Sequence, residues 1–278
     1  MPAMAPLLVL LPILVTTMAV AWAVALPAAI RRAFWIRPRF DTLPLDEAID
    51  ELNRPELAEA AARFDELADV LGRLGYRETE RCVAVNVTGQ RTLVMLLARD
   101  PVTETMAAVQ LVWSGSASDR RLQLRGEYYG LETQFDGRRD PLDPNADPNA
   151  AATLTVQTTT SPQVFPAPPS HHLLCIDWVR SLETAHRLHQ THCDRCRPIG
   201  ARPQSGGRSL ADRLTRRHAR VMAAAVRDGY LQPIRPGLLR LTRRGALHLT
   251  SRILWPLASA ITARERRQTR RMLQAWGA

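Results

Sequence analysis

The sequence predicts an α+β protein with an N-terminal transmembrane helix, an antiparallel sheet of about five strands with flanking helices, and a basic helical C-terminal tail. Three observations indicate this fold class: an uncharged N-terminal run, a series of short Val-, Leu- and Thr-rich segments, and Arg enrichment towards the C-terminus. The predicted units are 1–30 (transmembrane helix), 31–44 (juxtamembrane collar), 45–192 (α+β domain), 193–208 (linker) and 209–278 (basic helical tail with an interfacial amphipathic helix).

The N-terminal run extends from Pro2 to Ile30 without a charged side chain, and Arg31 and Arg32 follow it directly. About 20 helical residues cross a hydrocarbon layer about 30 Å thick, so the run is long enough to span a membrane. A cleaved signal peptide is the alternative, but it begins with a basic residue and has an apolar stretch of only about 7–15 residues. Because basic flanks stay in the cytoplasm, we expect a single-pass inner-membrane protein with its N-terminus outside and residues 31–278 in the cytoplasm.

The charged residues are unevenly distributed. All 37 basic residues are Arg, and the absence of Lys excludes sites built on a phosphate-binding, Schiff-base or general-base lysine. Residues 31–192 carry 18 Arg and 23 acidic residues, whereas residues 193–278 carry 19 Arg and 4 acidic residues, a net charge of +15. Such a polycationic tail indicates an anionic partner, and we expect anionic lipid headgroups rather than nucleic acid.

The soluble part begins with an aromatic collar and two helices. Trp35 and Phe40 in the collar are typical of the membrane interface. A short acidic helix reaches Leu52, and a second helix starts at Pro55 and ends before Gly75. Five strands should follow, at residues 81–88, 91–99, 105–113, 121–129 and 153–160. Short turns between most of them predict antiparallel pairing.

Two proline-containing segments interrupt the strands. The run 135–151 is expected to be a loop; its four Asp residues allow a calcium site, but their spacing does not match an EF-hand and favours a solvated turn. Residues 161–169 form a polyproline-like connector to a helix at 175–192.

The tail should contain a helix at 209–228, a turn at Gly229, two short extended pieces and a final amphipathic helix. The final helix is expected to lie in the membrane interface, and residues 245–263 could alternatively form a second span. Helix, hairpin and helix are similar to half of a winged helix, which supports a nucleic-acid-binding alternative. The predicted lipid-binding residues are Arg244, Arg252, Ile253, Trp255, Leu257, Arg264, Arg266 and Arg267.

A His/Cys cluster is the feature of the sequence that most resembles a metal-binding or reactive site. His186, His189, Cys193 and Cys196 fall on one face of the predicted helix, and His192 lies next to Cys193. These residue types are zinc ligands, but a tetrahedral site would require the helix to break near Cys193. The alternatives are a redox pair of Cys193 and Cys196, and an ordinary helix end in which both cysteines are reduced.

Several segments resemble those of an uncharacterised family of single-span bacterial membrane-anchored proteins. These are the helix from Phe64 to Tyr76, the strand that ends in Thr-Val-Gln-Thr-Thr-Thr160, the Pro-rich link, and the motif from Leu239 to Pro256. The resemblance implies an anchor with a small α+β cytoplasmic domain. It implies no catalytic residue, because the family has no assigned activity.

No catalytic motif is present: the sequence lacks G-x-S-x-G, H-E-x-x-H and Gly-rich phosphate loops. We therefore expect a membrane-anchored, non-enzymatic binding or scaffold protein whose tail contacts the anionic inner leaflet. The alternatives are a metal-binding or redox protein that uses residues 186–196, and a membrane-tethered nucleic-acid-binding protein. The sequence identifies neither ligand, protein partner nor oligomeric state.

Overall fold

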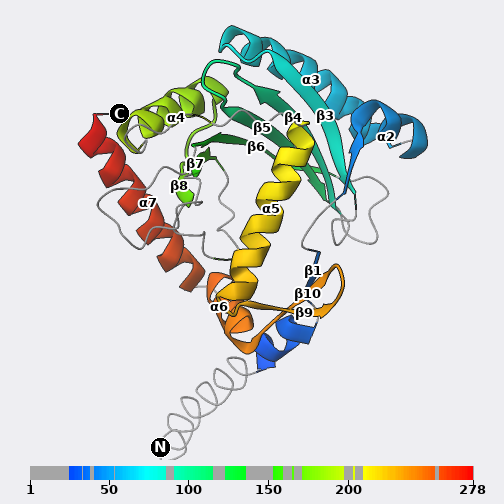
Figure 1. The fold of residues 1–278 in the computed structure, drawn as a ribbon, viewed down its shortest axis with the longest axis vertical. Helices are drawn as coiled ribbons and strands as arrows, with labels where there is room; N and C mark the ends of the chain where they lie inside the picture. Colours follow the sequence, from blue (N-terminus) through cyan, green and yellow to red (C-terminus); the bar gives the residue numbers. More distant parts are fainter. Residues whose placement is uncertain are drawn as a thin grey trace, which may run out of the picture.

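The structure is a computed structural model that describes residues 25–32, 34–37, 41–52, 54–85, 91–114, 123–135, 153–158, 165, 171–196, 203, 209–253 and 257–277. It contains a seven-stranded sheet, a separate three-stranded sheet and the helices that pack on them (Figure 1). The predicted α+β class is therefore confirmed. Most of the predicted anchor, residues 2–24, and residues 136–151 of the predicted loop lie outside the described residues.

The large sheet has the strand order β2-β3-β4-β5-β6-β7-β8. Its strands are β2 (Asp41–Pro44), β3 (Glu78–Val85), β4 (Arg91–Arg99), β5 (Met106–Ser114), β6 (Gln123–Gln134), β7 (Thr153–Gln157) and β8 (His171–Cys175). All neighbours pair antiparallel except β7 and β8, which are parallel. The five predicted strands are the central ones, β3 to β7. The expectation of a purely antiparallel sheet of about five strands is wrong at both edges.

The local sequences of the two additional strands, β2 and β8, do not indicate strands. β2 is the four-residue segment Asp-Thr-Leu-Pro, and β8 lies at the start of the segment predicted to lead into a helix. The parallel pairing of β8 with β7 requires a long connection, as parallel neighbours usually do, and residues 158–170 provide it. The helix predicted at 175–192 consequently begins later, as α4 (Leu182–Cys196).

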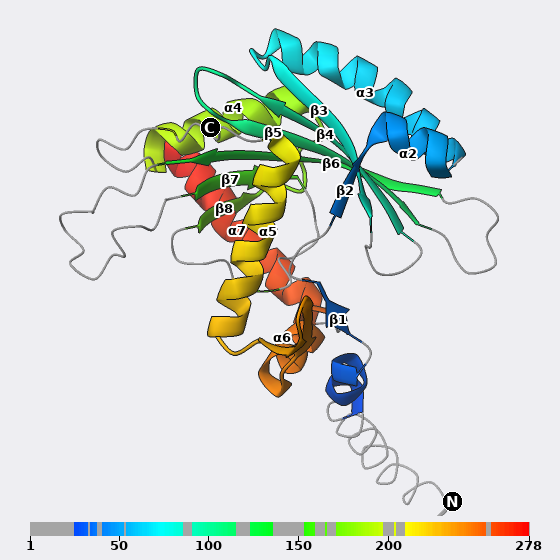
Figure 2. The ribbon, with the colours of Figure 1, turned by 45° about the vertical axis from the view of Figure 1, so that its right-hand side comes forward.

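Helices cover the large sheet on both faces (Figure 2). α2 (Leu45–Leu52), α3 (Pro55–Arg73) and α4 lie on one face, where Phe64 and Leu71 of α3 share a core with strand residues such as Leu96 and Leu131. α5 (Leu210–Arg227) crosses the other face, and its Leu210 and Leu214 pack against Met95, Leu97 and Met106. The alternation of side chains along β4 sends Leu96 to one core and Met95 and Leu97 to the other.

The small sheet has the order β1-β10-β9, with β1 (Trp35–Ile36), β9 (Leu231–Arg235) and β10 (Leu238–Leu241). It packs with the C-terminal half of α5 and with α6 (Arg243–Ile253). We call residues 25–37 and 219–253 the hairpin module. α7 (Leu257–Trp276) leaves this module and runs back towards α4, where Leu273 joins the main core (Figure 1).

Within the described part of the chain, no helix is long and apolar enough to cross a membrane. The second span considered for residues 245–263 corresponds to no single helix, because α6 ends at Ile253 and α7 begins at Leu257. The described end of the predicted N-terminal anchor, residues 25–30, is helical.

Candidate functional site

The residues that follow the predicted anchor form a strand of the hairpin module. β1 pairs antiparallel with β10, so that Trp35 lies opposite Arg240 and Ile36 opposite Leu239. The Arg240 Nε donates a hydrogen bond to the carbonyl oxygen of Arg31 at 3.1 Å, and the Trp35 Nε1 donates to the carbonyl of Arg32 at 2.9 Å. Residues more than 200 positions apart in the sequence are therefore joined at the point where the chain leaves the predicted anchor.

Apolar side chains fix this junction. Ile30, Phe34 and Ile36 pack against a core that includes Leu239 and Leu241. All three side chains are half-buried, so each contributes only part of the roughly 1.5–3 kcal/mol that full burial of such a side chain gives. Residues 34–36 of the predicted collar therefore belong to the module, whereas residues 41–44 form β2 of the large sheet.

The sequence of the hairpin module explains how tightly α6 docks. Gly229 and Gly237 have φ values of +75° and +73°, which side chains other than glycine rarely adopt. The Thr242 hydroxyl donates to the carbonyl of Gly229 at 2.6 Å and accepts a hydrogen bond from the backbone N–H of Gly245 at 3.0 Å, which caps α6. A Cβ atom at Gly245 would lie 2.0 Å from the carbonyl oxygen of Tyr230, so only glycine fits this close approach.

Three of the predicted lipid-binding arginines have protein partners. Arg244 donates to the carbonyl of Asp228 at 3.0 Å and lies over the ring of Tyr230. Arg252 pairs with Glu265 at 2.7 Å, and Arg266 pairs with Asp177. The guanidinium groups of these three arginines therefore make contacts that help to hold α6 and α7 in place.

The other predicted lipid-binding residues have different surroundings. Arg264 and Arg267 are exposed on α7. The side chains of Ile253 and Leu257, and all of Trp255, lie outside the described residues. Ala246 and Leu249 of α6 belong to the apolar stripe of the amphipathic pattern in this part of the tail, but they are only 1% and 6% exposed and pack in the module's core. These two side chains of the apolar stripe therefore contact protein.

The His/Cys cluster lies on α4, and its histidines face the interior. His186 Nδ1 is 3.2 Å from the hydroxyl of Tyr76, whereas the His192 ring stacks on Trp276 of α7. His189 is 1% exposed and its Nε2 lies 2.9 Å from the hydroxyl of Thr133. Burial lowers the pKa of His189 to about 3 and that of His192 to about 4, which keeps both rings neutral near pH 7.

The cysteines of this cluster are free thiols. Cys193 and Cys196 are half-buried against Phe135 and Leu154, and Cys193 Sγ is 3.4 Å from Nε2 of His189. The lowered pKa of His189 makes it a weak base for that thiol. No group of three or more His, Cys, Asp or Glu side chains within the described ranges is arranged to hold a metal ion. α4 remains helical to Cys196, so the break that a tetrahedral site would require near Cys193 is absent from this helix.

A buried ionic cluster lies between α5 and the sheet. Glu132 of β6 is 1% exposed and lies 2.9 Å from Nη1 of Arg217; the side chain of Gln134 donates to its other oxygen at 2.6 Å. Arg213 is 7% exposed and donates to the carbonyl of Glu104 at 3.1 Å. Although burial acts to raise it, the pKa of Glu132 is held below its ordinary value by Arg217 and Gln134. Sequence reasoning missed this cluster, although Arg213 and Arg217 have the spacing of one helix face.

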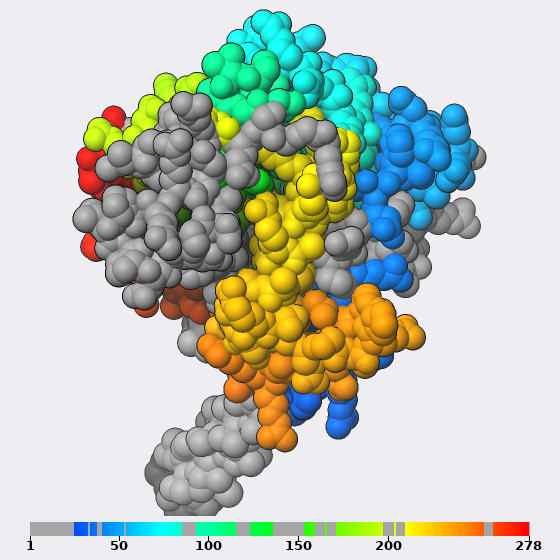
Figure 3. Space-filling view, in the orientation of Figure 1, coloured from blue at the N-terminus to red at the C-terminus, as the bar shows by residue number. Residues whose placement is uncertain are grey.

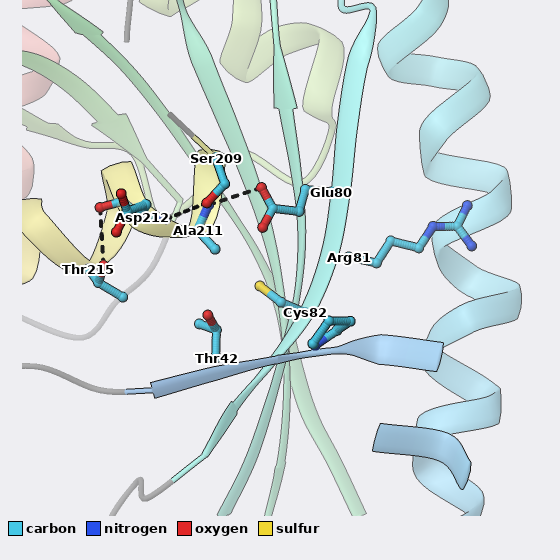
Figure 4. Close-up of a pocket in the computed structure, with 9 residues that line it drawn as sticks. Thr42, Glu80, Arg81, Cys82, Ser209, Ala211, Asp212 and Thr215 are labelled. Atoms are coloured by element: carbon cyan, nitrogen blue, oxygen red, sulfur yellow. Dashed lines mark hydrogen bonds between the residues drawn. The ribbon is translucent and has the colours of Figure 1, made fainter. Parts of the chain in front are cut away.

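A pocket of about 240 Å³ lies between β2, β3 and the N-terminus of α5 (Figure 4). Its lining residues are Thr42, Pro44, Glu80, Arg81, Cys82, Ser209, Ala211, Asp212 and Thr215. Glu80 accepts hydrogen bonds from the backbone N–H groups of Leu210 and Ala211, at 2.7 and 3.2 Å, and so caps α5. Burial raises the pKa of the Cys82 thiol to about 12, so the thiol stays protonated. Both groups thus have structural roles, and the pocket shows no activated nucleophile.

Comparison with protein-family models, with curated proteins and with solved structures found no match to this chain. The resemblance to single-span bacterial proteins stays a prediction.

Proposed function

We propose that this chain is a membrane-anchored, non-enzymatic binding or scaffold protein of the bacterial inner membrane. Residues 2–30 anchor it, residues 31–278 lie in the cytoplasm, and the hairpin module contacts the anionic inner leaflet. The body formed by the large sheet is then held near the membrane surface, where a partner can meet it.

The observation that carries this proposal is the pairing of β1 with β10. If the uncharged run spans the membrane, this pairing keeps the Arg-rich hairpin beside the membrane surface. The space-filling view supports this arrangement, because the orange surface of β9, β10 and α6 forms the end of the molecule next to the blue N-terminal residues (Figure 3).

α5 connects that end of the molecule to the body. Its C-terminal half contributes Met222 and Ala225 to the module's core, and its N-terminal half packs on the large sheet. A helix of 18 residues is about 27 Å long, and α5 packs one half of that length on the large sheet and the other half on the hairpin module. We infer that the body sits at a fixed distance from the leaflet rather than on a loose tether.

Topology reporters test the proposal. A fluorescent-protein fusion after Ala278 should be bright in intact bacteria, an alkaline phosphatase fusion at the same position should be inactive, and both should remain in the membrane fraction after a high-salt wash. An active phosphatase fusion would reverse the orientation. A mature protein that begins near Ala29 and is released as soluble material would refute the anchor itself. A full chain that is retained on duplex DNA in preference to anionic vesicles at physiological salt would favour the nucleic-acid alternative.

A further inference from the structure

The small sheet has one face against the core and one face directed away from it. Leu239 of β10 lies opposite Ile36 and Pro233, and Leu239 and Ile36 belong to the module's core. The neighbouring cross-strand row consists of Trp35, Arg240 and Gln232. Successive residues in a strand point to opposite faces, so this row lies on the opposite face. Next to this row, a register shift at Leu238 and Leu239 leaves Ile234 of β9 without a cross-strand partner, and its side chain is exposed. We call Trp35, Gln232, Ile234 and Arg240 the outer face.

The outer face exposes two large apolar side chains. Trp35 and Ile234 are each 44% exposed, whereas Leu231, Leu239 and Leu241 of the same sheet are buried. Arg235 at the end of β9 and Pro236 in the adjoining turn are exposed as well. An apolar and cationic face of this kind is costly to leave in water and has the composition of an interaction surface.

The position of the outer face indicates what covers it. The uncharged run ends at Ile30, and the backbone N–H of Phe34 donates to the carbonyl of Ile30 at 2.9 Å, so Trp35 follows the run within about one helical turn. Each polar headgroup region of a bilayer is about 5–8 Å deep beyond the hydrocarbon core. A side chain this close to the end of a span lies within reach of that layer.

The chemistry of the outer face fits the same partner. Tryptophan is enriched at headgroup depth, because its ring is apolar and its N–H is polar. Here the Trp35 Nε1 donates to the carbonyl of Arg32, Arg240 lies opposite Trp35 on β10, and Arg235 ends the next strand, β9. Anionic phosphate headgroups complement these arginines.

We propose that the outer face of the small sheet lies in the headgroup layer of the anionic leaflet, with Trp35 and Ile234 inserted and Arg235 and Arg240 contacting lipid phosphates. This inference rests on the proposed membrane anchoring and names the lipid-contacting surface. That surface differs from the predicted lipid-binding set, which runs from α6 into α7; α7 leads away from the module towards α4 (Figure 2).

Quenching of tryptophan fluorescence by brominated lipid tests this orientation. The full chain is reconstituted in vesicles that contain phosphatidylglycerol, with or without lipids brominated near the headgroup. Ile234→Trp adds a reporter on the outer face. The matched control is Val102→Trp, because Val102 is 85% exposed in the turn between β4 and β5. Arg213, in the N-terminal half of α5, donates a hydrogen bond to the carbonyl of Glu104 next to this turn. The turn therefore lies at the end of α5 that is away from the module.

The emission added by Ile234→Trp should fall by about half or more in brominated vesicles, because the side chain lies at headgroup depth. The emission added by Val102→Trp should be unchanged. Trp35→Phe should remove part of the quenchable emission of the parent. If the emission added at position 234 is quenched no more than that added at position 102, the outer face is not the lipid contact.

Trp22 separates this failure from failure of the anchor, because it lies within the uncharged run. Quenching that persists in Trp35→Phe and falls when Trp22→Phe is added would show that the run is still in the bilayer, and only the assignment of the outer face would then be overturned. Loss of all quenching, together with recovery of the protein outside the vesicles, would refute the membrane anchoring and this inference with it.

Discussion

The ion pair between Glu132 and Arg217 helps to hold α5 on the sheet, and removing its negative charge should lower the free energy of unfolding. Glu132→Gln keeps the side chain's shape but leaves the guanidinium groups of Arg217 and Arg213 without a carboxylate between α5 and β6. Breaking a fully buried pair costs about 3–5 kcal/mol. The Glu132 side chain is 1% exposed but that of Arg217 is 21% exposed, so Arg217 can regain some water. We therefore expect a loss of about 2–4 kcal/mol.

Urea unfolding of a chain that starts at Ala25, followed by circular dichroism, measures this loss. Arg227→Gln is the matched control, because the side chains of Arg227 and Asp228 form a pair that is 66% and 38% exposed. Its cost should stay below about 1 kcal/mol. Glu132→Leu combined with Arg217→Met removes both charges and should be less destabilising than Glu132→Gln alone. If Glu132→Gln matches the exposed control, the buried pair does not stabilise the docking of α5.

Three further outcomes follow from the structure. Burial lowers the pKa of His189 to about 3 and that of His192 to about 4, so the unfolded chain takes up protons at a higher pH than the folded chain does. The free energy of unfolding should therefore be highest above about pH 6.5 and should fall by about 2 kcal/mol per histidine as the pH is lowered to 5. Urea unfolding at a series of pH values measures this fall, and His189→Gln should reduce it. Gly245→Ala places a Cβ 2.0 Å from the carbonyl oxygen of Tyr230 and should lower the free energy of unfolding by more than about 2 kcal/mol. Gly72→Ala in α3, where a Cβ would meet nothing within 4 Å, should raise it by about 0.5–1 kcal/mol in the same assay. Equal effects of the two substitutions would contradict the close approach at Gly245. The purified chain should contain less than about half an equivalent of zinc by elemental analysis, and Cys193→Ser with Cys196→Ser should keep its thermal unfolding midpoint; stoichiometric zinc lost together with the fold would restore the metal site.

The sequence predicts the central strands because each combines β-forming residues with clear turns. It does not reveal β8, since His-His-Leu-Leu-Cys follows a proline-rich connector and pairs with β7 only through a crossover. The strand β1 cannot be predicted from the sequence at all. A two-residue strand has no periodicity, and its partner β10 lies about two hundred residues away in the sequence.

The sequence also predicts the local order of the tail but not its packing. Ser209 caps α5 and Gly229 ends it, as expected. However, Leu210 and Leu214 pack on the large sheet, and α7 sends Leu273 to the main core, so residues 209–278 contribute to both sheets' cores. Contacts of this kind depend on the tertiary fold rather than on local spacing. The same is true of His189, whose helical face could be identified but whose contact with Thr133 of β6 could not.

The most direct test of the account is whether the chain leaving the anchor is paired with the C-terminal hairpin inside the membrane. Trp35→Cys with Arg240→Cys places thiols at directly opposite strand positions, where Cβ atoms are about 4.5–5.5 Å apart and a disulfide can form with a small adjustment. Gln232→Cys with Arg240→Cys is the control within the hairpin. Mild oxidation of bacterial membranes should link both pairs within one full-length chain, detected by mass spectrometry of digested protein. Linking of positions 232 and 240 without linking of positions 35 and 240 would contradict the pairing on which the proposed function depends.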